Sequence, residues 1–155
     1  MRQDFDREEV VRELEARLQE ELDYRREAAN AERFRALFAS DQRVAIPRVY
    51  RELSSARVLT LEYLDGYPLQ DILAPGVDED VKRWVAEKLF RMLWRQVLEF
   101  GVLHADPHPG NYLVTHHPRI GLLDFGSVRV FEPAIRRGYL RLAREIGRAS
   151  CRERV

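Results

Sequence analysis

Two polar clusters separated by a short apolar hairpin constrain the fold of this chain more than any other feature. The first cluster runs from His104 to Asn111, and the second is Asp124-Phe125-Gly126. Between them, apolar runs at 112–114 and 120–123 flank a turn that contains a proline, and this pattern predicts two short antiparallel strands. The second strand leads directly into Asp124, so a single hairpin links the two clusters.

The residue types of the two clusters suit phosphoryl transfer. His104, Asp106 and Asn111 follow the catalytic-loop spacing H-x-D-x-x-x-x-N of protein kinases, and the second cluster is the D-F-G triplet that follows that loop. Because this chemistry depends mainly on positioning and charge neutralisation, hard oxygen ligands must hold Mg²⁺ against the phosphates. We therefore predict that Asn111 and Asp124 bind Mg²⁺. Asp106 would accept or orient the proton of an attacking hydroxyl or water, and His104 would support the loop by hydrogen bonding.

The first part of the chain predicts a helical region followed by a hairpin. Apolar residues recur at steps of three and four from about Asp6 to Phe38 without proline or glycine, which indicates one long helix or two in series. The β-branched and aromatic runs at 46–50 and 57–63 then indicate an antiparallel hairpin. The following segment, Asp65-Gly66-Tyr67-Pro68, is expected to break the chain.

Two further helices are expected on either side of the polar clusters. Asp78 can cap a helix that runs to about Phe100, with Gly101 at its C-terminal end. A closing helix is expected from about Pro133 to Ile146. The side chains expected on the buried face of the first helix are apolar: Val81, Trp84, Val85, Leu89, Met92 and Val97.

Composition excludes several classes of function. The chain has 26 basic and 26 acidic residues, which alternate along the helical stretches, so no positively charged surface for nucleic acid is evident. No apolar run approaches the roughly 18 residues that cross a bilayer, and the charged start lacks a signal-peptide core, so we expect this chain to be soluble. The histidines fall in loops without the H-E-x-x-H helix of zinc enzymes, which disfavours a zinc site.

The last ten residues, 146–155, resemble the translation of a common sequencing adapter. We therefore expect them to be a non-native tail and assign the domain to residues 1–145. The single cysteine, Cys151, lies in this tail, so it carries no functional meaning, and a lone cysteine excludes an internal disulfide.

The catalytic loop is closer to one family than to protein kinases in general. Its octapeptide, His104 to Asn111, contains Pro107-His108-Pro109-Gly110 and resembles the hallmark of the UbiB/ADCK family of atypical kinases. The stretch from Glu21 to Asn30 resembles that family's E-x-D segment, and 58–62 resembles its hinge strand. The three motifs come in the family's order along the chain.

The resemblance implies part of a protein-kinase-like α+β fold, made of an αC-type helix, the hinge hairpin and a portion of the helical C-lobe. By the same resemblance, Leu61 is the gatekeeper, and the Glu62 carbonyl and Leu64 amide face adenine. Either Glu21 or Glu27 would lie near the nucleotide-binding lysine, and the sequence leaves that choice open.

The resemblance also implies a function for a longer parent protein. That protein would bind ATP and Mg²⁺ and act as an ATP-dependent kinase-like phosphotransferase or ATPase in the biosynthesis of ubiquinone or another isoprenoid quinone. Its expected partners are the nucleotide, quinone-biosynthesis proteins and membrane lipid. Its expected location is the cytoplasm or the inner membrane, as a peripheral or anchored protein.

The departures from the family pattern concern the nucleotide cleft. The only lysines, Lys82 and Lys88, fall in the predicted helix after Asp78, so neither is the strand lysine that contacts the α- and β-phosphates. The nucleotide loop and the K-x-G-Q extension would precede Met1 in the parent, so we expect weak or no ATP affinity for this chain alone. Two alternatives stay open: a small-molecule phosphotransferase of the aminoglycoside or choline kinase type, and a non-catalytic pseudokinase module.

Overall fold

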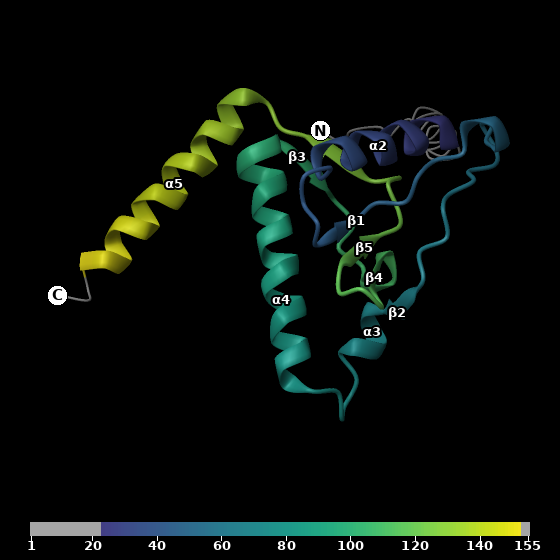
Figure 1. The fold of residues 1–155 in the computed structure, drawn as a ribbon. Helices are drawn as coiled ribbons and strands as arrows, with labels where there is room; N and C mark the ends of the chain where they lie inside the picture. The colour runs from purple at the N-terminus through teal and green to yellow at the C-terminus, as the bar shows by residue number, and fades with distance from the viewer. Residues whose placement is uncertain (1–22, 153–155) are drawn as a thin grey trace, which may run out of the picture.

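The computed structural model describes residues 23–152, in which helices α2 and α4 flank a four-stranded, mainly antiparallel sheet, and a second sheet has two strands (Figure 1). The helices are α2 (Tyr24–Leu37), α3 (Leu69–Ile72), α4 (Glu79–Trp94) and α5 (Pro133–Arg152). The strands are β1 (Val44–Ala45), β2 (Gly66–Pro68), β3 (Val102–His104), β4 (Tyr112–Thr115), β5 (Ile120–Leu122) and β6 (Val128–Val130). The α+β class and the kinase-like fold expected from the sequence are confirmed.

Helix α2 begins at a well-defined N-cap. The Asp23 backbone is extended, and its side chain accepts a hydrogen bond from the Arg25 N–H at 3.0 Å. The predicted single helix from Asp6 to Phe38 is therefore wrong, whereas the first of the two predicted helices in series lies outside the described residues. The predicted apolar positions Val11, Leu14, Leu18 and Leu22, together with Glu21, lie outside the described residues.

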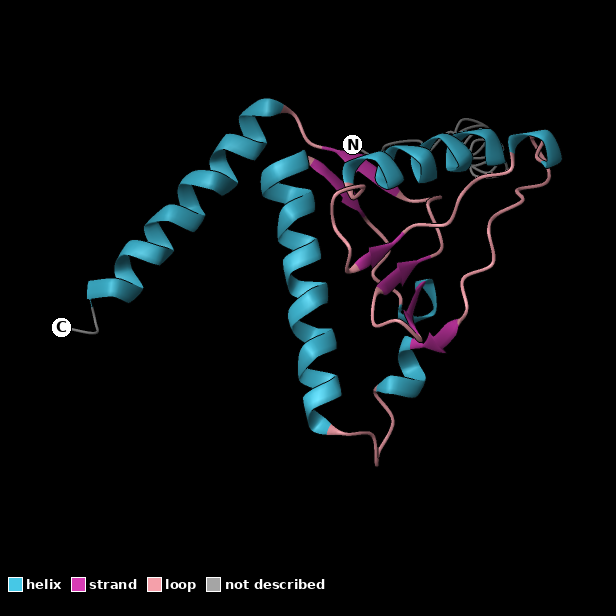
Figure 2. Cartoon of the chain, viewed as in Figure 1, coloured by secondary structure: helices cyan, strands magenta, loops and turns pink. Residues whose placement is uncertain are grey.

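The main sheet has the strand order β1-β5-β4-β2, with β1 parallel to β5 and the other pairs antiparallel (Figure 2). The predicted hairpin of β4 and β5 is confirmed, with Tyr112 opposite Leu122 and Val114 opposite Ile120. The predicted chain break at 65–68 is wrong, because Gly66 to Pro68 form β2 and pair with β4. A Cβ at Gly66 would lie 2.5 Å from the Val114 carbonyl oxygen, so only glycine allows this close approach.

The predicted hairpin of 46–50 and 57–63 occurs in reduced form. Its antiparallel pairing is an isolated bridge between Val49 and Leu61, extended by a hydrogen bond from the Tyr50 N–H to the Thr60 carbonyl at 2.9 Å. A short 3-10 helix at Arg51–Leu53 follows the first segment. The two segments therefore pair over few residues and do not form regular strands.

Helix α4 follows the prediction closely. The Asp78 side chain caps it at the Asp80 N–H, the helix continues as a π-helical segment over Arg95–Phe100, and Gly101 ends it in the left-handed conformation with φ of 65°. Val85, Met92 and Val97 are buried as expected, whereas the expected burial of Val81 is wrong. Val81 is exposed, as are Phe90 and Leu93 farther along the helix.

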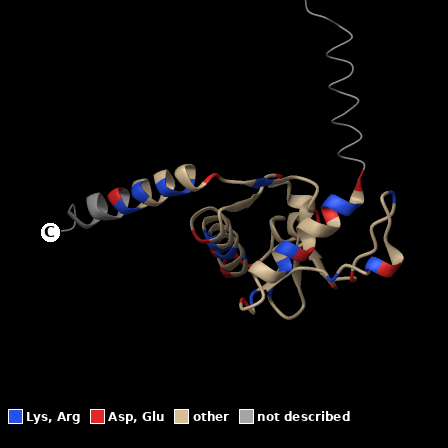
Figure 3. Cartoon of the chain, turned by 90° about the horizontal axis from the view of Figure 1, so that it is seen from above, with Lys and Arg blue, Asp and Glu red and all other residues tan. Residues whose placement is uncertain are grey.

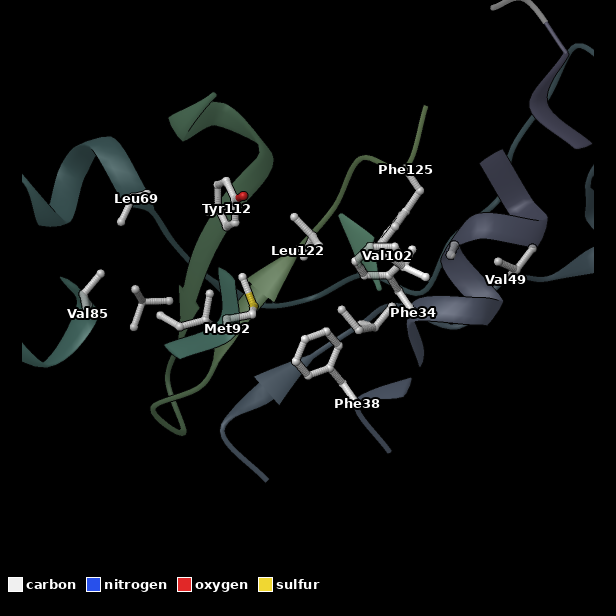
Figure 4. Packing of buried hydrophobic residues seen from close by; sticks show 14 of the residues in the cluster. Phe34, Phe38, Val49, Leu69, Val85, Met92, Val102, Tyr112, Leu122 and Phe125 are labelled. Atoms are coloured by element: carbon white, nitrogen blue, oxygen red, sulfur yellow. The ribbon is translucent and has the colours of Figure 1, made fainter. Parts of the chain in front are cut away.

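The core lies between α2, the main sheet and α4. Phe34 of α2 and Phe125 are fully buried, and their ring centroids lie 5.5 Å apart (Figure 4). Ile120 and Leu122 fill the centre from the sheet, and Met92 closes it from α4. Since the core joins α2 to the hairpin, it fixes the position of α2 relative to the loops that the hairpin carries.

Helix α5 extends away from the rest of the molecule (Figures 1 and 3). The Arg136 guanidinium holds its first turn by donating to the main-chain oxygens of Leu98, at 2.9 Å, and Glu99, at 2.7 Å. The predicted helix end at Ile146 is wrong, because the helix continues to Arg152. No helix in the described range 23–152 is long and apolar enough to cross a membrane.

Candidate active site

Two pairs of strands flank the predicted catalytic loop, residues 105–111, and the predicted metal loop, residues 123–127. At one end of the loops, β4 pairs with β5, and the Leu123 N–H donates to the Asn111 carbonyl at 3.0 Å. At the other end, β3 pairs with β6, and the Ala105 N–H donates to the Ser127 carbonyl at 2.8 Å. Each loop is thus anchored at both ends by main-chain hydrogen bonds, and the two polar clusters meet at the same end of the hairpin.

Asp106 and Asn111 face each other across the catalytic loop. The Asn111 Nδ2 donates to Asp106 Oδ2 at 2.8 Å and to the Asp106 main-chain oxygen at 3.3 Å. Because a carboxylate can only accept, this contact fixes the amide orientation and leaves Asn111 Oδ1 as the free oxygen. Asp106 Oδ1 accepts the His108 N–H at 3.3 Å, and Gly110 donates to His108 Nδ1 at 3.0 Å, which closes the turn.

A side chain and a main-chain amide hold Asp124 from two sides. Its carbonyl oxygen accepts a hydrogen bond of 2.5 Å from His104 Nε2, and its Oδ1 accepts the Gly126 N–H at 2.8 Å. The prediction that His104 supports the loop is confirmed: the ring is buried against Phe34, Tyr112 and Phe125. Since a carbonyl only accepts, Nε2 carries a proton and donates it to this contact, so the ring supports the loop by hydrogen bonding.

The donor set at this end of the hairpin fits a magnesium ion. Asp124 Oδ2 and Asn111 Oδ1 take part in no hydrogen bond among the described residues, and both are hard oxygen donors. No group of three or more histidine, cysteine or acidic side chains that could hold a metal by itself occurs in the described part of the chain. A cation here would therefore need further oxygens from water or phosphate, as Mg²⁺ usually does.

Glu27 brings a third carboxylate to the site. Glu27 belongs to the first turn of α2, its side chain is half-buried, and its Oε1 accepts the Phe125 N–H at 3.3 Å. Burial raises the pKa of Glu27 above its ordinary value; the Phe125 N–H opposes this rise, and the charge of Asp124 adds to it. Two acidic groups, Glu27 and Asp124, therefore lie close enough together for their charges to interact.

The predicted hinge residues, Leu61, Glu62 and Leu64, lie in the segment that precedes β2. The Glu62 N–H and carboxylate are bound to Arg48, whereas the Glu62 carbonyl and the Leu64 N–H have no hydrogen bond within the described part. The Leu64 side chain packs against β5, 3.4 Å from the position of a Cβ on Gly121. Leu61 is partly buried against the core. The free main-chain groups of Glu62 and Leu64 are those that the resemblance assigns to adenine.

A hollow of about 630 Å³ lies beside the hinge, lined mainly by the end of α2, the segment 41–46, Glu62, Leu64 and Arg119. Neither Asp106 nor Asp124 lines it. The hollow therefore lies apart from the predicted catalytic and metal residues and next to the predicted hinge residues.

The family assignment follows from a match over nearly the whole chain. Residues 1–149 match the family model described as the ABC1 atypical kinase-like domain. This chain belongs to the ABC1 family of atypical kinases. The resemblance to the UbiB/ADCK kinases is thereby confirmed, because relatives of this ABC1 domain carry the names of that group. One relative is the chloroplastic Protein ACTIVITY OF BC1 COMPLEX KINASE 1 of Arabidopsis thaliana, which is 42% identical to this chain over 124 residues. Another is the mitochondrial Atypical kinase COQ8B of Rattus norvegicus, which is 36% identical to this chain over 126 residues.

The ABC1 domain described here is only a part of such proteins. It covers 18% of the Arabidopsis protein and 23% of the rat protein, although the matches take in 78% and 80% of this chain. A solved structure, the complex of Rv3197 with erythromycin from Mycobacterium tuberculosis, aligns over 79% of this chain and 30% of its own, with 33% identity and a TM-score of 0.69. The fold of the chain is thus that of a segment within a larger kinase-like protein.

One residue of the site carried no role in the sequence interpretation. The Asn30 Nδ2 donates to the Phe125 carbonyl oxygen at 3.0 Å, one helical turn from Glu27. The available signal was its position at i+3 from Glu27, between the apolar residues Ala28 and Ala31 on the buried side of α2. A polar side chain there needs a partner, and the sequence alone does not identify it.

Proposed function

We propose that this chain is the catalytic-loop and metal-loop segment of an ABC1-type atypical kinase that uses Mg-ATP. The observation that carries the proposal is the convergence of Asp106, Asn111 and Asp124 at the end of the hairpin, with Asn111 Oδ1 and Asp124 Oδ2 free to bind a cation. Kinase-like family membership supports the use of a nucleotide.

Each residue would have a distinct role. Asn111 and Asp124 would hold Mg²⁺, which neutralises phosphate charge when bound. Asp106 would orient the attacking hydroxyl or water, with its carboxylate held by Asn111 Nδ2 and the His108 N–H. The Glu62 carbonyl and the Leu64 N–H would bind adenine, and Leu61 would be the gatekeeper residue.

Glu27 is the carboxylate that we expect to pair with the nucleotide-binding lysine of the parent protein. It lies beside Asp124, and burial, with a contribution from the Asp124 charge, raises the pKa of its carboxyl group. The lysines of this chain do not fill that role: Lys82 bonds to Glu79 at 2.8 Å on α4, and Lys88 lies on the same helix. Glu21, the other candidate for this role, remains open because it lies outside the described residues.

The metal role can be tested in the full-length parent protein. Mg-ATP binding and ATP turnover would be measured for the wild type, for Asp124→Asn and for Asp71→Asn, a control acidic residue on the exposed surface of α3. We expect the control to match the wild type and Asp124→Asn to lose metal-dependent turnover. Equal activity of all three proteins would refute the metal role of Asp124.

We further propose that the parent protein supports the biosynthesis of an isoprenoid quinone such as ubiquinone, together with quinone-biosynthesis proteins at the surface of a membrane. Membership of the family to which the COQ8B-named relative belongs supports this. The test is the quinone content of cells that lack the parent gene and carry either the wild-type or the Asp124→Asn copy. Normal quinone content in the deletion strain would refute this role, whatever the outcome of the ATP measurements.

A further inference from the structure

Two side chains of α2 hold both main-chain groups of Phe125. Glu27 Oε1 accepts the Phe125 N–H at 3.3 Å, and Asn30 Nδ2 donates to the Phe125 carbonyl oxygen at 3.0 Å. The two contacts use opposite hydrogen-bonding roles from positions one turn apart on the helix, so they fix the orientation of this residue's backbone as well as its position.

The Phe125 ring adds a third contact to the same helix. It is fully buried, and its centroid lies 5.5 Å from that of Phe34, one turn beyond Asn30 on α2. Phe125 is therefore attached to α2 by its amide, its carbonyl and its ring. Because it directly follows Asp124, the position of α2 is transmitted to a residue that carries a free carboxylate oxygen.

We propose that Asn30 is a positioning residue of the metal loop: by holding the Phe125 carbonyl, its carboxamide sets the direction in which the Asp124 carboxylate points. The part of this inference that concerns metal affinity rests on the proposed function. The part that concerns the backbone stands on the contacts of Asn30 alone. Outer partners of metal ligands commonly change metal affinity when they are removed, although they never touch the ion.

The most direct variant is Asn30→Asp, which keeps the size of the side chain but replaces the donor with an acceptor facing the Phe125 carbonyl. Asn30→Ala removes the donor but raises helix propensity, and Asn30→Gln keeps a donor on a longer stem. Two controls match these changes on exposed surface: Arg33→Ala on the outer face of α2, and Gln70→Glu on α3.

The first measurement is amide hydrogen exchange of this chain, followed residue by residue by NMR. We expect the amides of Phe125 and Gly126 to exchange about tenfold faster in Asn30→Asp and Asn30→Ala, while the amides of β4 and β5 keep their rates. Asn30→Gln should restore part of the protection, and both controls should match the wild type. Unchanged exchange at Phe125 and Gly126, or equal acceleration throughout the chain, would overturn the proposal.

The second measurement is Mn²⁺ binding in the presence of ATP, followed by electron paramagnetic resonance in the full-length parent. Asn30→Asp should weaken Mn²⁺ binding about tenfold without changing the affinity for ATP in the absence of metal. Unchanged Mn²⁺ affinity alongside faster local exchange would overturn the metal part of the inference. If the wild-type parent binds no Mn²⁺ with ATP, the proposed function fails, and the exchange experiment still decides the role of Asn30.

Discussion

Replacing Phe125 tests whether its ring belongs to the core that underlies Asp124. The ring has no exposed surface and packs against Phe34 and His104, so Phe125→Ala removes a buried aromatic side chain and leaves a cavity beneath α2. Such changes cost about 3–5 kcal/mol in the free energy of unfolding, of which the aromatic pair with Phe34 contributes about 0.5–1.5 kcal/mol. For a domain whose total stability is about 5–15 kcal/mol, this is a large share.

The assay is urea unfolding of this chain followed by circular dichroism. Phe125→Leu serves as a milder variant and should cost less than about 2 kcal/mol, because it keeps most of the apolar volume. The matched control is Phe90→Ala on α4, since Phe90 is 62% exposed and its removal should cost less than about 1 kcal/mol. Similar losses for Phe125→Ala and Phe90→Ala would refute the assignment of Phe125 to the core.

Three further predictions concern charge and ligand binding. Because burial raises the pKa of Glu27, the charged form of this side chain destabilises the folded chain, and Glu27→Gln should raise the midpoint of thermal unfolding at pH 7. This gain should vanish below the ordinary pKa range of carboxyl groups, where Glu27 is protonated in both the folded and the unfolded chain. A gain that grows as the pH falls would contradict the raised pKa. Arg95→Lys should cost about 1–2 kcal/mol of unfolding free energy in urea titrations, because the guanidinium bridges Asp41 and Glu99 and stacks on two phenylalanine rings. The control is Arg91→Lys in the exposed pair Arg91–Glu87, and equal losses of the two variants would refute this reasoning. Calorimetry should detect weak or no binding of Mg-ATP to residues 1–155, since phosphate contacts dominate nucleotide affinity, and micromolar binding would contradict this expectation.

The sequence was sufficient for the features that depend on local pattern. The β4–β5 hairpin follows from two apolar runs around a turn, and the ends of α4 follow from Asp78 as cap and Gly101 as terminator. The proximity of Asp106, Asn111 and Asp124 follows from the motif spacing, because the hairpin between them is short.

The features that were missed depend on contacts between distant segments. Strand β2 contains a glycine and a proline, both of which usually interrupt strands, and it forms because Gly66 can approach the Val114 carbonyl. Asn30 bonds to a residue 95 positions away, so no local pattern reveals its partner. Val81 has the spacing of a buried residue, but the packing around α4 leaves it exposed.

The ladders on either side of the candidate site hold its two loops by main-chain atoms, whereas the proposed chemistry depends on side chains. The bonds that anchor the loops, between Leu123 and Asn111 and between Ala105 and Ser127, join main-chain atoms that nearly every amino acid can supply. A substitution at Leu123 or Ala105 that keeps the backbone N–H therefore keeps the donor of the anchoring bond. The path of the two loops depends on the backbone of these positions, whereas the chemistry proposed for the site depends on the side chains of Asp106, Asn111 and Asp124.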